Sequence, residues 1–84
     1  MWRKNRNPND NSGCYGVDLN RNYGYFWMTS GSSRAPCSDI YAGKFANSEL
    51  EVQAVERALR AQIGKWDAFL TFHSYGQWWF TPCK

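Results

Sequence analysis

The sequence has no long apolar run, no cluster of basic residues and only one histidine. Its unbroken apolar stretches fall far short of the roughly 18 to 20 residues that cross a bilayer, and Met1 to Pro8 lacks the apolar centre of a signal peptide. The net charge of +3 arises from basic residues scattered beside acidic ones, which argues against a nucleic-acid surface. We therefore expect a soluble chain that binds neither membranes nor nucleic acid.

Aromatic residues, in contrast, are abundant for a chain of this length. Trp, Tyr and Phe each occur five times among the 84 residues. A chain of this size buries only about 60 to 65% of the surface that its unfolded form exposes, so its own core would be thin. We expect the 84 residues to make up one domain at most. We also expect that they lack neighbouring segments that would cover their aromatic side chains.

The three cysteines allow one disulfide and leave one residue over. Cys14 and Cys37 flank a segment rich in glycine, serine and aromatic residues. Cross-linking a loop of that length stabilises a protein by about 3 kcal/mol if the geometry fits, which favours pairing these two. Cys83 would then be free or bridged outside the chain.

One helix is predicted over about residues 48 to 63. Ser48-x-x-Glu51 is typical of a capping box, and Gly64 stands where a helix normally stops. Glu49 and Glu56 are interpreted, with Glu51, as solvated groups of this capped helix rather than as a general base. Apolar residues recur between the two ends at three- and four-residue steps, as a helix requires: Val52, Val55, Leu59 and Ile63.

Two short strands are expected between this helix and the C-terminus, and two surface loops are expected before the helix. Trp66 to Phe72 is mostly apolar, as in a strand buried on both faces of a helix-covered sheet, and a second strand is predicted over Gln77 to Thr81. His73 follows the first strand, at the strand end where open α/β sheets bind ligands. Turn-forming residues over Asn5 to Gly16 and Thr29 to Pro36 predict the surface loops.

Arg21 and His73 are the candidates for chemistry. A planar guanidinium binds a carboxylate through two parallel hydrogen bonds, and Asn20 offers amide donors beside it. Histidine nitrogen can hold zinc, which polarises a peptide carbonyl and activates water. The alternatives are a solvated loop arginine and a structural histidine held by hydrogen bonds, which is the commoner use of a lone histidine.

Three segments of the chain resemble the zinc metallocarboxypeptidases of the pancreatic carboxypeptidase A/B type: Trp2-Arg3-Lys4, Gly16-Val17-Asp18-Leu19-Asn20-Arg21-Asn22 and Phe72-His73-Ser74-Tyr75. The resemblance runs nearly end to end but covers only the middle of such an enzyme. It implies an α/β fold in which residues 1–84 are a partial catalytic domain, part of a mixed β-sheet flanked by helices. It also implies secretion, because these enzymes carry a disulfide at the positions that match Cys14 and Cys37, and disulfides form in oxidising compartments.

The resemblance implies a role for each matching residue. His73 would be the third zinc ligand, Asn20 and Arg21 would hold the terminal carboxylate of a peptide, and Arg3 would stabilise the oxyanion. Without the resemblance, Arg3 is one of several basic residues near the N-terminus.

Three further residues also match the family. Ser74 and Tyr75 match residues that line the substrate cleft, although Tyr75 could equally be a packed aromatic. Asp18 matches an aspartate that orients a zinc-bound imidazole through its other nitrogen, and its alternative is a turn residue that bonds its own backbone.

The function predicted from these residues is hydrolysis of C-terminal peptide bonds, with zinc as cofactor, peptide or protein C-termini as substrate and the rest of the parent domain as partner. The family's upstream His-x-x-Glu motif and downstream catalytic glutamate have no match in the 84 residues, so the chain alone is expected to be inactive. The alternative is a truncated, non-catalytic binding module or inactive remnant. A third hypothesis is an aromatic binding surface on Trp78 and Trp79.

Overall fold

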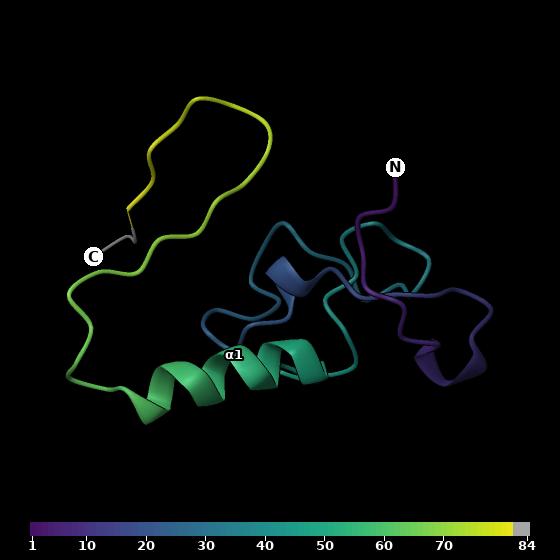
Figure 1. The fold of residues 1–84 in the computed structure, drawn as a ribbon. Helices are drawn as coiled ribbons and strands as arrows, with labels where there is room; N and C mark the ends of the chain where they lie inside the picture. Colours follow the sequence, from purple (N-terminus) through teal and green to yellow (C-terminus); the bar gives the residue numbers. More distant parts are fainter. Residues whose placement is uncertain (82–84) are drawn as a thin grey trace.

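The computed structural model describes residues 1–81 of the chain. It contains two short 3-10 helices, η1 (Asn9–Asn11) and η2 (Leu19–Arg21), and one α-helix, α1 (Leu50–Ala61). Figure 1 shows the loops that precede α1 gathered beside the start of that helix, whereas the chain beyond α1 follows a wide, open course. Of the described helices, none has both the length and the apolar character needed to cross a membrane.

The helix α1 confirms the predicted helix and lies inside the predicted range. The capping box predicted for Ser48 and Glu51 is wrong, because the N-cap is Glu49 and no side chain caps the helix there. Ser48 Oγ donates to Glu49 Oε2 at 2.6 Å, and Glu51 accepts a hydrogen bond from Asn5 Nδ2 at 3.2 Å. Donors and acceptors from the N-terminal loop thus replace the local capping contacts.

Glu49 is buried, so its interpretation as a solvated residue is wrong. Its Oε1 accepts hydrogen bonds from Asn5 Nδ2 at 2.8 Å and Asn7 Nδ2 at 2.7 Å, in addition to the Ser48 bond to Oε2. These donors replace the water that a buried carboxylate loses. Glu49 therefore ties the N-terminal loop to the start of α1.

The core is thin, as the length of the chain predicts. A buried asparagine, Asn22, organises it by donating from Nδ2 to Ala42 O at 2.8 Å and to Ser48 Oγ at 2.9 Å. Gly43 makes this approach possible, because a Cβ there would lie 2.5 Å from Asn22 Nδ2 and its φ is +89°. The buried apolar residues of the described chain are Val17, Tyr41, Ala42 and Val52.

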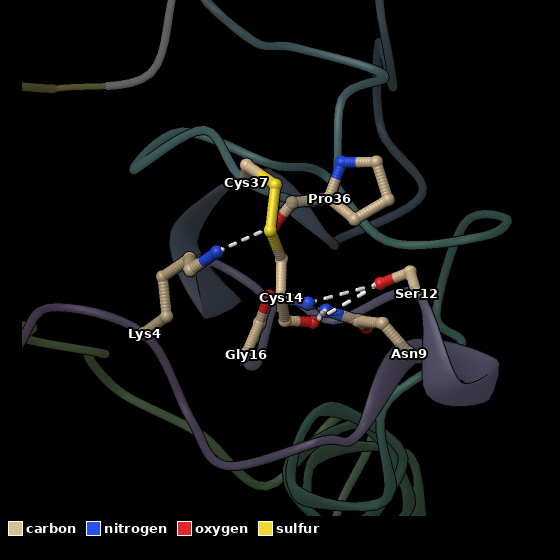
Figure 2. Close-up of a disulfide and its surroundings, with 7 residues drawn as sticks. All are labelled: Lys4, Asn9, Ser12, Cys14, Gly16, Pro36 and Cys37. Atoms are coloured by element: carbon tan, nitrogen blue, oxygen red, sulfur yellow. Dashed lines mark hydrogen bonds between the residues drawn. A yellow bond between two sulfur atoms is a disulfide. The ribbon is translucent and has the colours of Figure 1, made fainter.

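The structure contains the predicted disulfide between Cys14 and Cys37, whose Cα atoms are 5.0 Å apart. Figure 2 shows Lys4 reaching across beside this bridge, where its Nζ donates to Pro36 O at 2.7 Å. The disulfide and the buried Lys4 together join the N-terminal segment to the loop that ends at residue 37. The prediction for Cys83 lies outside the described residues.

The two strands predicted over Trp66 to Phe72 and Gln77 to Thr81 are not present among residues 1–81. Within residues 1–81, the β pairing is an isolated bridge between Ser33 and Tyr41. Both predicted segments are exposed along their length. A strand needs a neighbouring strand to satisfy its N–H and C=O groups, and neither segment has one here. The predicted strand count is therefore not confirmed.

Candidate active site

Asp18 is the centre of the candidate site. It is 4% exposed and forms the N-cap of η2, where its Oδ1 accepts a hydrogen bond from the Asn20 backbone N–H at 3.2 Å. The Asp18 backbone N–H donates to Tyr41 O at 2.8 Å, and the preceding carbonyl, Val17 O, accepts from Asn5 N at 3.0 Å. Backbone contacts on two sides therefore fix the position of this carboxylate.

Arg3 approaches Asp18 from the N-terminal segment. Its Nε and Nη2 both donate to Asp18 Oδ2, at 2.9 and 2.8 Å. The Arg3 side chain is 47% exposed, whereas that of Asp18 is 5% exposed, so the buried carboxylate restrains a guanidinium that still reaches solvent. Because Nε and one N–H of Nη2 are engaged, the N–H groups of Nη1 and the second N–H of Nη2 are left for another acceptor.

Arg21 ends η2 on the other side of Asp18. Its Nε donates to Gly31 O at 2.8 Å and lies 3.9 Å from Asp18 Oδ2. Within residues 1–81 no hydrogen bond engages its two Nη nitrogens, and the side chain is 35% exposed. A carboxylate can therefore reach the pair of Nη nitrogens that a bidentate contact requires.

Asn20 brings His73 to η2 across a separation of 53 residues. Asn20 Nδ2 lies 3.2 Å from His73 Nδ1, and Thr71 Oγ1 lies 3.1 Å from His73 Nε2. An amide nitrogen can only donate, so His73 Nδ1 is the acceptor in this contact. Each ring nitrogen of His73 is thus engaged by a neighbour.

Ser74 and Tyr75 lie outside this cluster. The peptide bond between them is cis, and Tyr75 is fully exposed. No hydrogen bond within residues 1–81 involves either side chain. The structure therefore links five of the predicted site residues by one series of contacts and leaves these two apart. The linked residues are Arg3, Asp18, Asn20, Arg21 and His73.

The donors in the described part of the chain do not fit a zinc site by themselves. No group of three or more His, Cys, Asp or Glu side chains that could hold a metal ion occurs there. His73 is the single histidine of the sequence, and both of its ring nitrogens have hydrogen-bonding neighbours. A stable zinc site needs several ligands, so further residues would have to supply them.

A hollow of about 340 Å³ beside Arg21 was not predicted from the sequence. Its wall includes the Gly31 segment and the aromatic side chains that follow η2. The signal for it was present, because aromatic residues cluster directly after the Asn20-Arg21 pair. The part of the lining that carries large apolar side chains is Tyr23, Tyr25, Phe26, Trp27 and Met28.

Tyr41, whose carbonyl holds Asp18, has a perturbed phenol. Burial raises the pKa of Tyr41 above its ordinary value, and the negative charge of Glu49 raises it further. The phenol is therefore neutral at physiological pH and adds no charge near the site.

The zinc carboxypeptidase family model matches residues 1–84. Mast cell carboxypeptidase A of Mus musculus is 44% identical over 82 residues, which are 98% of this chain and 20% of that protein. Carboxypeptidase B of Bos taurus is also 44% identical over 82 residues, with the same two coverages.

Solved structures show the same relationship. Bovine thrombin-activatable fibrinolysis inhibitor, in complex with tick carboxypeptidase inhibitor, matches with a TM-score of 0.86 and 45% sequence identity over 92% of this chain and 26% of that one. The chain spans about a fifth to a quarter of the length of these relatives. Its described fold is consistent with the corresponding part of a metallocarboxypeptidase. The chain belongs to the zinc carboxypeptidase family.

Proposed function

We propose that residues 1–84 are a segment of the catalytic domain of a secreted, zinc-dependent carboxypeptidase that hydrolyses the C-terminal peptide bond of peptides and proteins. The observation that carries this proposal is the set of contacts joining Arg3, Asn20, Arg21 and His73 around Asp18. Two of these residues, Arg3 and His73, lie near opposite ends of the described chain. Membership of the family supports the same reading.

Arg21 and Asn20 bind the free α-carboxylate of the substrate in this proposal. The hydrogen bond from Arg21 Nε to Gly31 O orients the guanidinium and leaves both Nη nitrogens for the two carboxylate oxygens. Asn20 precedes Arg21 in η2 and adds an amide donor next to that group. This arrangement selects the last residue of a peptide, because an internal peptide bond offers no free carboxylate.

Arg3 stabilises the oxyanion that forms when the scissile carbonyl is attacked. Its Nε and one N–H of Nη2 are held by Asp18, so the N–H groups of Nη1 and the second N–H of Nη2 are the donors left for the developing negative charge. A restrained positive charge at that oxygen stabilises the transition state more than the ground state.

Zinc binding belongs to the assembled domain in this proposal. His73 supplies one of three protein ligands, and the other two ligands and the catalytic base come from residues outside this chain. Asp18 would also orient a zinc-bound imidazole through Oδ1, which has capacity for a second donor. Ser74 and Tyr75 would line the cleft. The disulfide between Cys14 and Cys37 supports an oxidising, extracellular location.

The size of the native protein tests the proposal. An antibody raised against residues 1–84 should detect a species several times the 9.8 kDa of this chain, since the chain covers 20% of mast cell carboxypeptidase A. That species, once purified, should release C-terminal residues from peptides. A native species of 9.8 kDa without peptidase activity would contradict the proposal and favour a non-catalytic binding module or inactive remnant.

A further inference from the structure

We propose that Asp18 is a positioning residue that anchors Arg3 and Arg21 at a fixed separation, so that one cation meets the oxyanion while the other meets the terminal carboxylate. This inference rests on the proposed function and adds a role that the resemblance does not assign to Asp18.

The two oxygens of Asp18 serve different parts of the molecule. Oδ2 accepts both hydrogen bonds from Arg3, at 2.8 and 2.9 Å. Oδ1 accepts the backbone N–H of Asn20 and so fixes the start of η2, the element that carries Arg21. One buried carboxylate therefore connects the segment that carries one cation to the helix that carries the other.

The negative charge of Asp18, placed near both cations, suits this role. Two guanidinium groups near each other repel, and a buried anion between them offsets the repulsion. Asp18 Oδ2 lies 2.8 Å from Arg3 Nη2 and 3.9 Å from Arg21 Nε. Arg3 turns Nε and Nη2 toward this carboxylate, and Arg21 turns Nε toward Gly31. Within residues 1–81, Nη1 of Arg3 and both Nη nitrogens of Arg21 therefore remain without a hydrogen bond.

The chemistry of the substrate requires a fixed spacing between the cations. The scissile carbonyl and the terminal carboxylate are separated only by the backbone of the last residue, whose length does not change with its side chain. Misplacing a reacting group by about 1 Å can lower the rate by about a hundredfold. A shared anchor keeps the distance between the two cations constant for substrates that differ in their side chains.

This role differs in its consequences from the orientation of a zinc-bound imidazole. If Asp18 acts through Arg3, weakening it lowers kcat even at saturating zinc, and that loss disappears when Arg3 can no longer make its fork-shaped contact. If Asp18 acts through the metal, zinc affinity falls and the loss is independent of Arg3.

A double-mutant cycle in the full-length protein that carries this segment separates the two. Asp18→Asn preserves shape and removes the charge, and Arg3→Lys preserves charge and removes the fork on a side chain that is half exposed and tolerant of change. The control is Asp39→Asn, which makes the same charge change at an exposed site. The readouts are kcat, KM and bound zinc per protein.

At a zinc concentration that saturates each variant, we expect Asp18→Asn and Arg3→Lys each to lower kcat by about a hundredfold. The double variant should fall less than about threefold below Arg3→Lys alone, while Asp39→Asn matches the wild type. Losses that multiply in the double variant at saturating zinc would overturn the proposal. Arg3→Lys keeps the test informative even if Asp18→Asn does not fold.

A second readout needs no activity. In nitrogen-resolved NMR spectra of the same full-length protein, the Arg3 Nε–H should exchange with water more slowly than that of the exposed Arg57, because Asp18 accepts it. Asp18→Asn should abolish the difference and Asp39→Asn should not. Equal exchange for Arg3 and Arg57 in the wild type would refute the anchor. An absence of peptidase activity alongside a slowly exchanging Arg3 would instead refute the proposed function.

Discussion

Replacing Arg21 with alanine should remove selectivity for a free C-terminal carboxylate while leaving the fold nearly intact. The guanidinium has both Nη nitrogens available, and each charge-assisted hydrogen bond to a carboxylate is worth about 1.5 to 3 kcal/mol. Two such bonds give about 3 to 6 kcal/mol, or roughly 10² to 10⁴ in kcat/KM at about 1.4 kcal/mol per factor of ten.

The structural role of the same side chain is much smaller. Arg21 donates one hydrogen bond to Gly31 O, and its contact with Asp18 is 3.9 Å at a partly exposed site. Interactions of this kind contribute about 1 kcal/mol or less. Loss of the side chain should therefore affect substrate recognition far more than the free energy of unfolding.

The assay compares kcat/KM for a peptide and for its C-terminal amide, using the full-length protein that carries residues 1–84. Arg21→Ala should lower kcat/KM for the free peptide by about 10² to 10⁴ and leave the weak cleavage of the amide nearly unchanged. Arg57→Ala, a substitution at an exposed position of α1, is the control and should alter neither value. Equal losses on both substrates would refute the role of Arg21 in binding the carboxylate.

The isolated 84-residue chain should melt without cooperativity and bind hydrophobic dyes, because Ile63 and most of the aromatic side chains after it are exposed; a sharp two-state melt with a dispersed NMR spectrum would contradict this. Its zinc affinity by titration calorimetry should be weak because His73 is its single histidine, and tight binding of one zinc ion would show that the chain builds a site alone. Gly43→Ala should lower the melting temperature of the full-length protein more than Gly13→Ala does. Both glycines have positive φ, but only at Gly43 does an added Cβ meet another atom, at 2.5 Å from Asn22, so equal shifts would argue against that close contact.

The parts of the fold that depend on local sequence were predictable. The spacing of apolar residues that include Val52 and Leu59 predicts α1. The glycine and serine residues between Cys14 and Cys37 predict a loop that a disulfide would stabilise. Each of these depends on residues close together in sequence. The parts that depend on distant partners were not predictable in the same way.

The start of α1 illustrates the difference. Ser48 and Glu51 have the spacing of a capping box, yet Ser48 bonds to Glu49 and Glu51 accepts from Asn5, a residue 46 positions away. Local capping contributes about 1 kcal/mol, which a few hydrogen bonds from another segment can outweigh. The burial of Glu49 has the same origin and no local signal.

The predicted strands are a second case in which the local structure depends on a distant partner. The apolar run from Trp66 to Phe72 has the composition of a buried strand, but composition cannot supply the neighbour with which a strand pairs. Over the described residues that neighbour is missing, and the segment is exposed.

Candidate residues for the site could be proposed from the sequence, but their contacts could not. The motif around Asn20 and Arg21 and the segment around His73 supply these candidates, whereas the pairing of Arg3 with Asp18 joins positions 15 residues apart through the fold. The carbonyl of Gly31, which orients Arg21, carries no side-chain signal at all. Backbone acceptors of this kind become visible only in a structure.

The most direct test of the account is the release of C-terminal residues by the native protein that contains residues 1–84. The protein should release the last residue of a peptide with a free carboxylate and leave its amide essentially intact. A chelator should abolish the release, and added zinc should restore it. Failure of the zinc-loaded protein to release any C-terminal residue, or equal cleavage of the amide, would contradict the assignment of Arg21 and His73 to a carboxypeptidase site.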